Sequence, residues 1–93
     1  MGAKAILTLK VMPESVETDL KVIQLHIEKA IKEIYGEVGP IRVSDEPIAF
    51  GLRALKFEFI IDETLGSDPI EDKVRELEGV ASAQVIDFRR AIG

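Results

Sequence analysis

The chain contains no cysteine, and this absence removes several kinds of chemistry at once. Without cysteine there is no disulfide, no thiolate metal site and no cysteine nucleophile. Histidine occurs once, as His26, so no second imidazole can share a metal ion with it. The apolar spacing around His26 predicts a partly exposed side chain on a helix. We therefore expect no metal site and no bound cofactor.

Long hydrophobic runs are also missing. No apolar stretch approaches the ~20 residues of a membrane-spanning helix, and residues 1–4 lead into strand-like sequence without an apolar signal segment. We therefore expect a cytoplasmic protein that contacts no membrane. Positive charge is scarce as well, since 12 Lys and Arg against 17 Asp and Glu give a net charge of −5. Nucleic acid backbones are bound through clustered Lys and Arg, so we expect no direct nucleic acid partner.

The motifs of covalent catalysis and nucleotide binding are absent too. No serine lies in a G-x-S-x-G context, and no glycine-rich loop has the spacing of a phosphate-binding loop. The adjacent carboxylates at 45–46 and at 62–63 point to opposite sides of an extended chain, so neither pair makes an acid–base couple by itself. We expect a protein that is not an enzyme and that acts by binding.

Alternating apolar residues predict the strands of this chain. With 93 residues, of which 46% are hydrophobic, the chain suits one domain, 1–93, with a modest core. Strong period-two alternation predicts strands at 3–11 and 52–62, and weaker patterns predict strands at 41–44 and 80–90. Residues 45–51 read as the turn between the two middle strands.

A three-and-four spacing of apolar residues predicts two helices. The first can be capped by Ser15 or Thr18 and ends at Gly36, and the second starts at Ser67 or Asp68. The order β-α-β-β-α-β, with right-handed crossovers, is that of the ferredoxin-like arrangement in the α+β class. We expect a four-stranded, mostly antiparallel sheet with both helices on one face.

Two features remain as candidate binding groups. Phe50 lies in a tight turn between Pro47 and Gly51, where a polar residue is more usual. It either meets a partner or continues a strand and covers the edge of the core. The pair Arg89-Arg90 is either a second binding group or a solubilising chain end.

Other functions of ferredoxin-like domains have less support. An RNA-binding module would stack bases on sheet aromatics, but Phe57 and Phe59 share the apolar face of their strand. A small acyl-phosphate hydrolase would need an Asn, and the chain has none. A regulatory, ligand-sensing domain that dimerises through sheet edges stays open as the alternative.

Four segments carry a resemblance to a known family. Lys10–Ser15, Asp45–Leu52, Glu78–Val80 and Asp87–Arg90 resemble, in the same order, the archaeal form of translation elongation factor 1-beta. The Pro-Ile-x-Phe-Gly block at 47–51 is also similar to the exchange domain of the eukaryotic factor. The resemblance implies a ferredoxin-like fold. It also implies a translation elongation factor that promotes exchange of GDP for GTP on elongation factor 1-alpha, acting as a free-standing module.

The resemblance also implies which residues act. In eukaryotic relatives the aromatic of the block contacts the GTPase, and Phe50 holds that position here, beside Pro47, Ile48, Gly51 and Arg53. We expect these five residues to bind the partner.

A lysine near the C-terminus of those relatives reaches the Mg²⁺ and phosphate site, and the matching position here is Arg90, with Arg89 beside it. We expect both arginines to act in exchange, and to enter the same pocket of the partner as Phe50.

Overall fold

A computed structural model describes residues 3–91, so residues 1, 2, 92 and 93 of the predicted domain lie outside the described part. The order of helices and strands is β-α-β-β-α-β, as predicted. The elements, including two short 3₁₀ turns, are β1 (Lys4–Pro13), α1 (Leu20–Tyr35), β2 (Arg42–Pro47), η1 (Ala49–Gly51), β3 (Arg53–Asp62), η2 (Glu63–Leu65), α2 (Asp68–Arg75) and β4 (Val80–Arg90).

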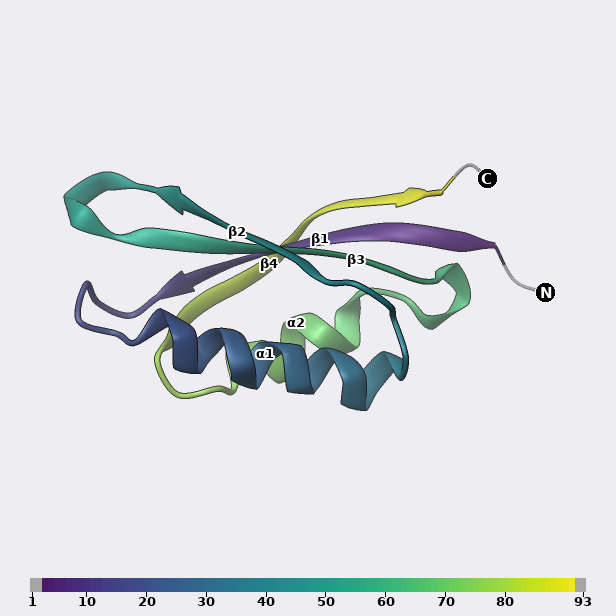
Figure 1. The fold of residues 1–93 in the computed structure, drawn as a ribbon, viewed down its shortest axis with the longest axis horizontal. Helices are drawn as coiled ribbons and strands as arrows, with labels where there is room; N and C mark the ends of the chain where they lie inside the picture. Colours follow the sequence, from purple (N-terminus) through teal and green to yellow (C-terminus); the bar gives the residue numbers. More distant parts are fainter. Residues whose placement is uncertain (1–2, 92–93) are drawn as a thin grey trace.

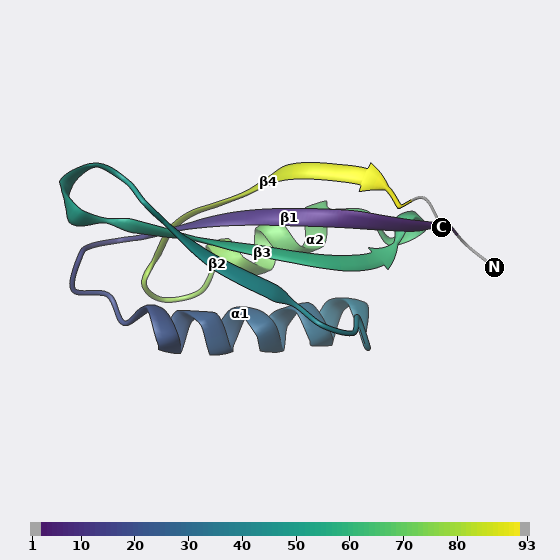
Figure 2. The ribbon, with the colours of Figure 1, turned by 45° about the horizontal axis from the view of Figure 1, so that its top comes forward.

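The four strands form one sheet in the order β2-β3-β1-β4, and every pair of neighbours is antiparallel. Both helices lie on the same face of this sheet, and the other face is left open (Figures 1 and 2). This is the ferredoxin-like α+β arrangement, so the predicted fold class is confirmed. The sheet places β2 and β4 at its two edges.

The core lies between the sheet and the helices. Every second residue of β1 and β3 points into it, as the alternation predicts. α1 and α2 each pack one apolar stripe against the sheet and so cover the core. The largest fully buried side chains are those of Phe57, Phe59, Leu7, Leu9, Ile27, Ile31, Ile70, Val11 and Val74.

The start of α1 differs from the prediction. Asp19 is the N-cap, and its carboxylate accepts hydrogen bonds from the backbone N–H groups of Lys21 and Val22. Ser15 and Thr18 instead bond to each other within the preceding loop, where the Ser15 N–H donates to Oγ1 of Thr18 at 3.2 Å. A carboxylate at this position also stabilises the helix, because its negative charge lies at the positive end of the helix dipole.

β2 is longer than predicted, and this moves the turn. Asp45, Glu46 and Pro47 were expected in the turn, but they pair with the first residues of β3. The hairpin loop therefore holds only the residues between Pro47 and Arg53.

The sheet is elongated. The molecule measures 44 × 22 × 20 Å. The β2–β3 hairpin lies at one end of the long axis, and the start of β1 and the end of β4 lie at the other (Figure 1). Among residues 3–91, no helix is long and apolar enough to cross a membrane.

Candidate functional site

The hairpin loop between β2 and β3 presents an aromatic ring to solvent. We call residues 47–53 the tip loop. Phe50, at its centre, is 94% exposed. Because a large apolar side chain gains nothing from solvent, an exposed ring at a loop tip is typical of a contact surface.

The backbone of the tip loop holds Phe50 in this position. The Ile48 N–H donates to the Leu52 carbonyl at 2.8 Å, and the Leu52 N–H donates to the Ala49 carbonyl at 3.3 Å. Phe50 has φ 64° and ψ 27°, the left-handed region, which costs a non-glycine residue about 1–2 kcal/mol. The alternative in which this segment continues a strand is therefore wrong.

All five predicted partner-binding residues lie in the tip loop. Pro47 and Arg53 are directly paired across the hairpin, and Ile48 is half-buried, whereas Phe50 is exposed. Gly51 follows with φ 77°. Arg53 donates from Nη1 to Oδ2 of Asp45 at 2.6 Å, which ties the base of the loop. The structure thus brings this predicted group together.

The loop between β1 and α1 adds an apolar residue that the sequence interpretation missed. A Cβ placed on Gly51 would lie 3.6 Å from Cγ1 of Val16, so the two loops are in contact. Val16 is 62% exposed. Its only signal in the sequence is its isolation between Glu14-Ser15 and Glu17-Thr18, in a stretch that needs no apolar residue. Val16 and Phe50 therefore both expose apolar surface at this end of the molecule.

A small charge cluster lies on the open sheet face near the tip loop. Glu46 lies 3.2 Å from Nζ of Lys56 and 3.6 Å from Nζ of Lys10. The hydrogen bond from Lys56, together with the charge of Lys10, holds the pKa of Glu46 below its ordinary value. The carboxylate thus stays ionised in the neutral range and helps to align β1, β2 and β3.

The two predicted arginines lie at the end of β4. The Arg90 guanidinium donates from Nε and Nη2 to the two carboxylate oxygens of Glu63, at 3.0 and 2.9 Å. This two-point hydrogen bond raises the pKa of Arg90, so the guanidinium is permanently charged. Arg89 lies on the opposite face of the strand, with its Nε 3.2 Å from Oδ2 of Asp87.

The tip loop and the two arginines are far apart. Arg53 begins β3 beside the tip loop, and Glu63, the partner of Arg90, directly follows the end of the same strand. Ten strand residues separate the two groups, or roughly 30 Å at the usual rise per residue. The expectation that Phe50 and the arginines enter one pocket is therefore wrong, because the rigid sheet holds them at opposite ends (Figure 2).

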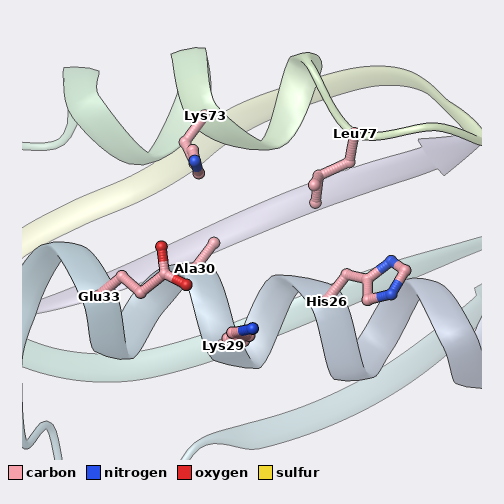
Figure 3. Close-up of a pocket in the computed structure, with 6 residues that line it drawn as sticks. All are labelled: His26, Lys29, Ala30, Glu33, Lys73 and Leu77. Atoms are coloured by element: carbon pink, nitrogen blue, oxygen red, sulfur yellow. The ribbon is translucent and has the colours of Figure 1, made fainter.

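His26 lies in a groove between the two helices. Figure 3 shows it at one end of this groove, with Glu33 and Lys73 toward the other end. The side chain is exposed, as predicted. Within residues 3–91 there is no group of three or more His, Cys, Asp or Glu side chains that could hold a metal ion. The groove therefore offers polar contacts but no arrangement for metal chemistry.

Fold and site together define a small ferredoxin-like domain with an exposed aromatic loop at one end and two exposed arginines at the other. Similarity to known proteins identifies its family. The family model of the EF-1 guanine nucleotide exchange domain matches residues 6–91. The chain belongs to this family.

Individual relatives agree with the family model. The chain is 41% identical over 85 residues to elongation factor 1-beta of Staphylothermus marinus, covering 89% of this chain and 91% of that protein. It is 38% identical over 88 residues to elongation factor 1-beta of Methanobrevibacter smithii, covering 94% and 96%. The protein therefore has a guanine nucleotide exchange role in translation elongation, as a regulator of a GTPase.

Proposed function

We propose that this chain acts as one exchange domain, 1–93, that binds elongation factor 1-alpha in the cytoplasm and speeds the replacement of GDP by GTP. The observation that carries the proposal is Phe50 at the end of the β2–β3 hairpin. Its backbone is strained, and its ring is almost fully exposed. Strain and exposure both cost the free protein, and a partner that buries the ring compensates for them.

Exchange requires only differential binding. If the domain binds the nucleotide-free GTPase more tightly than the GDP form, it weakens GDP binding by the same factor, because the coupling between the two ligands is reciprocal. No covalent step is needed. The direction of exchange then follows from the relative amounts of GTP and GDP.

The two ends of the domain have different roles in this proposal. The tip loop supplies affinity, with Phe50 filling an apolar pocket of the partner and Val16 contributing beside it. Arg90 supplies a permanent positive charge, which repels the partner's Mg²⁺ and replaces part of its interaction with the nucleotide phosphates. Because a guanidinium is planar and larger than an ammonium, Arg90 also offers paired hydrogen bonds to phosphate.

The separation of the two ends sets the shape of the complex. With roughly 30 Å between the tip loop and Arg90, the domain contacts two separate regions of the GTPase. The antiparallel sheet between them acts as a stiff spacer.

Release of fluorescent GDP tests the proposal. Elongation factor 1-alpha is loaded with the labelled nucleotide, excess unlabelled nucleotide is added, and the loss of fluorescence is followed with and without this protein. We expect a concentration-dependent acceleration. Arg90→Ala should lower the maximal rate of GDP release and change the half-saturating concentration less. Arg90→Lys should restore part of the maximal rate. No acceleration at micromolar protein contradicts the proposal.

A further inference from the structure

The first half of β4 has its outer edge covered by two side chains of α2. The Val85 N–H donates to Oε2 of Glu71 at 2.6 Å, and Nε of Arg75 donates to the Ala83 carbonyl at 3.1 Å. Glu71 and Arg75 lie one helical turn apart, and their charged groups are 3.9 Å from each other. We call them the edge clip. They satisfy backbone groups that a further strand would otherwise bind.

The second half of β4 has no such cover. The Ala91 N–H donates to the Lys4 carbonyl at 2.8 Å, and bonded and non-bonded pairs alternate along an antiparallel ladder. Arg89 is therefore bonded to β1, while Phe88 and Arg90 turn their backbone N–H and C=O groups outward. Among residues 3–91, no side chain hydrogen-bonds to these outward groups.

The two edges of the sheet differ in this respect. β2 carries Arg42, Asp45 and Glu46 and ends at Pro47, features that discourage pairing with another strand. The uncovered half of β4 instead exposes Ile86 and Phe88, at 45% and 39%. It is thus the edge better suited to accept a strand.

We propose that this uncovered half of β4 pairs with the same segment of a second copy of the chain. The pairing is antiparallel and its two-fold axis passes through Phe88, so that residues 86–90 of the two copies form a continuous ribbon. Each Phe88 then exchanges backbone hydrogen bonds with Phe88 of the second copy.

The charges of β4 complement each other in this register. Asp87 and Arg89 pair with Thr8 and Ile6, whose neighbours in β1 are buried, so both charged residues lie on the open sheet face. Antiparallel pairing about Phe88 places Asp87 of one copy directly opposite Arg89 of the other, twice. Opposite charges across a strand pair favour association, and like charges oppose it. The existing contact between Asp87 and Arg89, at 3.2 Å, becomes part of a group of four charges.

The edge clip limits the ribbon. Since Glu71 and Arg75 occupy the outer edge at Ala83 and Val85, the second copy can pair only with the residues after them. A ribbon of this length buries less surface than a stable dimer interface does, so we expect a weak dimer with a dissociation constant of about 0.1–1 mM.

Sedimentation equilibrium of the full chain tests this proposal, over about 10 µM to about 1 mM protein. We expect the mean mass to rise from one copy toward two. Asp87→Arg places Arg opposite Arg, and Arg89→Asp places Asp opposite Asp, so each variant alone should stay monomeric. An equimolar mixture of the two restores opposite charges at both positions, and its mean mass should rise again.

Matched controls separate this effect from a change in net charge. Glu37→Arg and Lys29→Glu change the charge by the same amounts as Asp87→Arg and Arg89→Asp, at exposed positions outside β4, and should leave the wild-type association unchanged. Urea denaturation confirms that each variant is folded. If a reversal variant does not fold, Asp87→Asn takes its place and should weaken association several-fold.

Four outcomes overturn the proposal. One is a single-copy mass for the wild type at every concentration. Another is a reversal variant that associates like the wild type, and the third is a mixture of the two variants that stays monomeric. If β4 amides become protected from hydrogen exchange only when elongation factor 1-alpha is added, the edge accepts a different protein and the second copy is excluded. Since the sedimentation experiment contains no GTPase, its outcome is independent of the proposed exchange activity.

Discussion

Replacing Phe50 with alanine should separate binding from folding. With 94% of the residue exposed, folding buries only a small part of a side chain that offers roughly 200 Å². About 10–15 Å² at ~25 cal/mol per Å² is worth ~0.3 kcal/mol of unfolding free energy. We therefore expect Phe50→Ala to unfold at nearly the wild-type urea concentration.

Binding should respond much more strongly. Burial of most of the ring in a partner pocket is worth about 4 kcal/mol by area, and ordering costs reduce this figure, so a loss of roughly 2 kcal/mol is a fair expectation. That loss corresponds to about a 30-fold weaker complex. In the labelled-GDP assay, the half-saturating concentration of the Phe50→Ala protein should rise by that factor, with a smaller change in the maximal rate.

A glycine at the same position provides an internal check on the strain. Gly adopts the left-handed conformation freely, which relieves about 1–2 kcal/mol, but its flexible unfolded state costs about 0.5–1 kcal/mol. Phe50→Gly should thus be up to about 1 kcal/mol more stable than the wild type in urea denaturation, while it binds no better than Phe50→Ala.

Leu25→Ala is the matched control. Leu25 is 65% exposed on α1 and is not part of the tip loop, so its truncation removes a comparable apolar side chain from outside the proposed site. Its exchange activity should equal that of the wild type. Normal exchange by Phe50→Ala, or equal impairment of Leu25→Ala, contradicts the role of Phe50 as the binding anchor.

Three further predictions follow from the same geometry. Combining Phe50→Ala with Arg90→Ala should reduce exchange by the product of the two single effects, within about 0.5 kcal/mol in a double-mutant cycle, because the groups share no contacts. Glu71→Ala should lower the unfolding free energy by about 1 kcal/mol in urea, since the partly buried Val85 N–H loses its acceptor, and Glu71→Gln should recover part of it. Burial raises the pKa of Tyr35 from 10.0 to about 12, so stability should fall as pH rises between these values, and Tyr35→Phe should remove that dependence.

The strands of the core could be predicted because one of their faces is covered by helices. β1 alternates from Ala5 to Pro13 and β3 from Leu55 to Asp62, since each residue that points into the core is flanked by residues on the open face. β4 could not be phased. Its pairing with β1 shifts register between Thr8 and Leu9 and again between Met12 and Pro13, and each irregularity breaks the period of two.

The tip loop could be located from the sequence, but its conformation could not. Pro47 and Gly51 mark a turn, yet they do not reveal that Phe50 itself adopts the left-handed region. The contact with Val16 joins segments 35 residues apart in the chain, which no local pattern encodes. The ion pair of Arg90 with Glu63 is likewise not encoded locally, because only the pairing of strands in the sheet brings these two residues together.

The irregular register of β4 decides which arginine is available on which side. Arg90 pairs with the buried residue Ala5 and so lies on the helix side of the sheet, whereas Arg89 pairs with Ile6 on the open face. Side chains on opposite faces of a strand cannot enter one narrow pocket together. We therefore propose different contacts for the two neighbouring guanidinium groups: Arg90 with the metal and phosphates of the GTPase, and Arg89 with the second copy at the edge of β4.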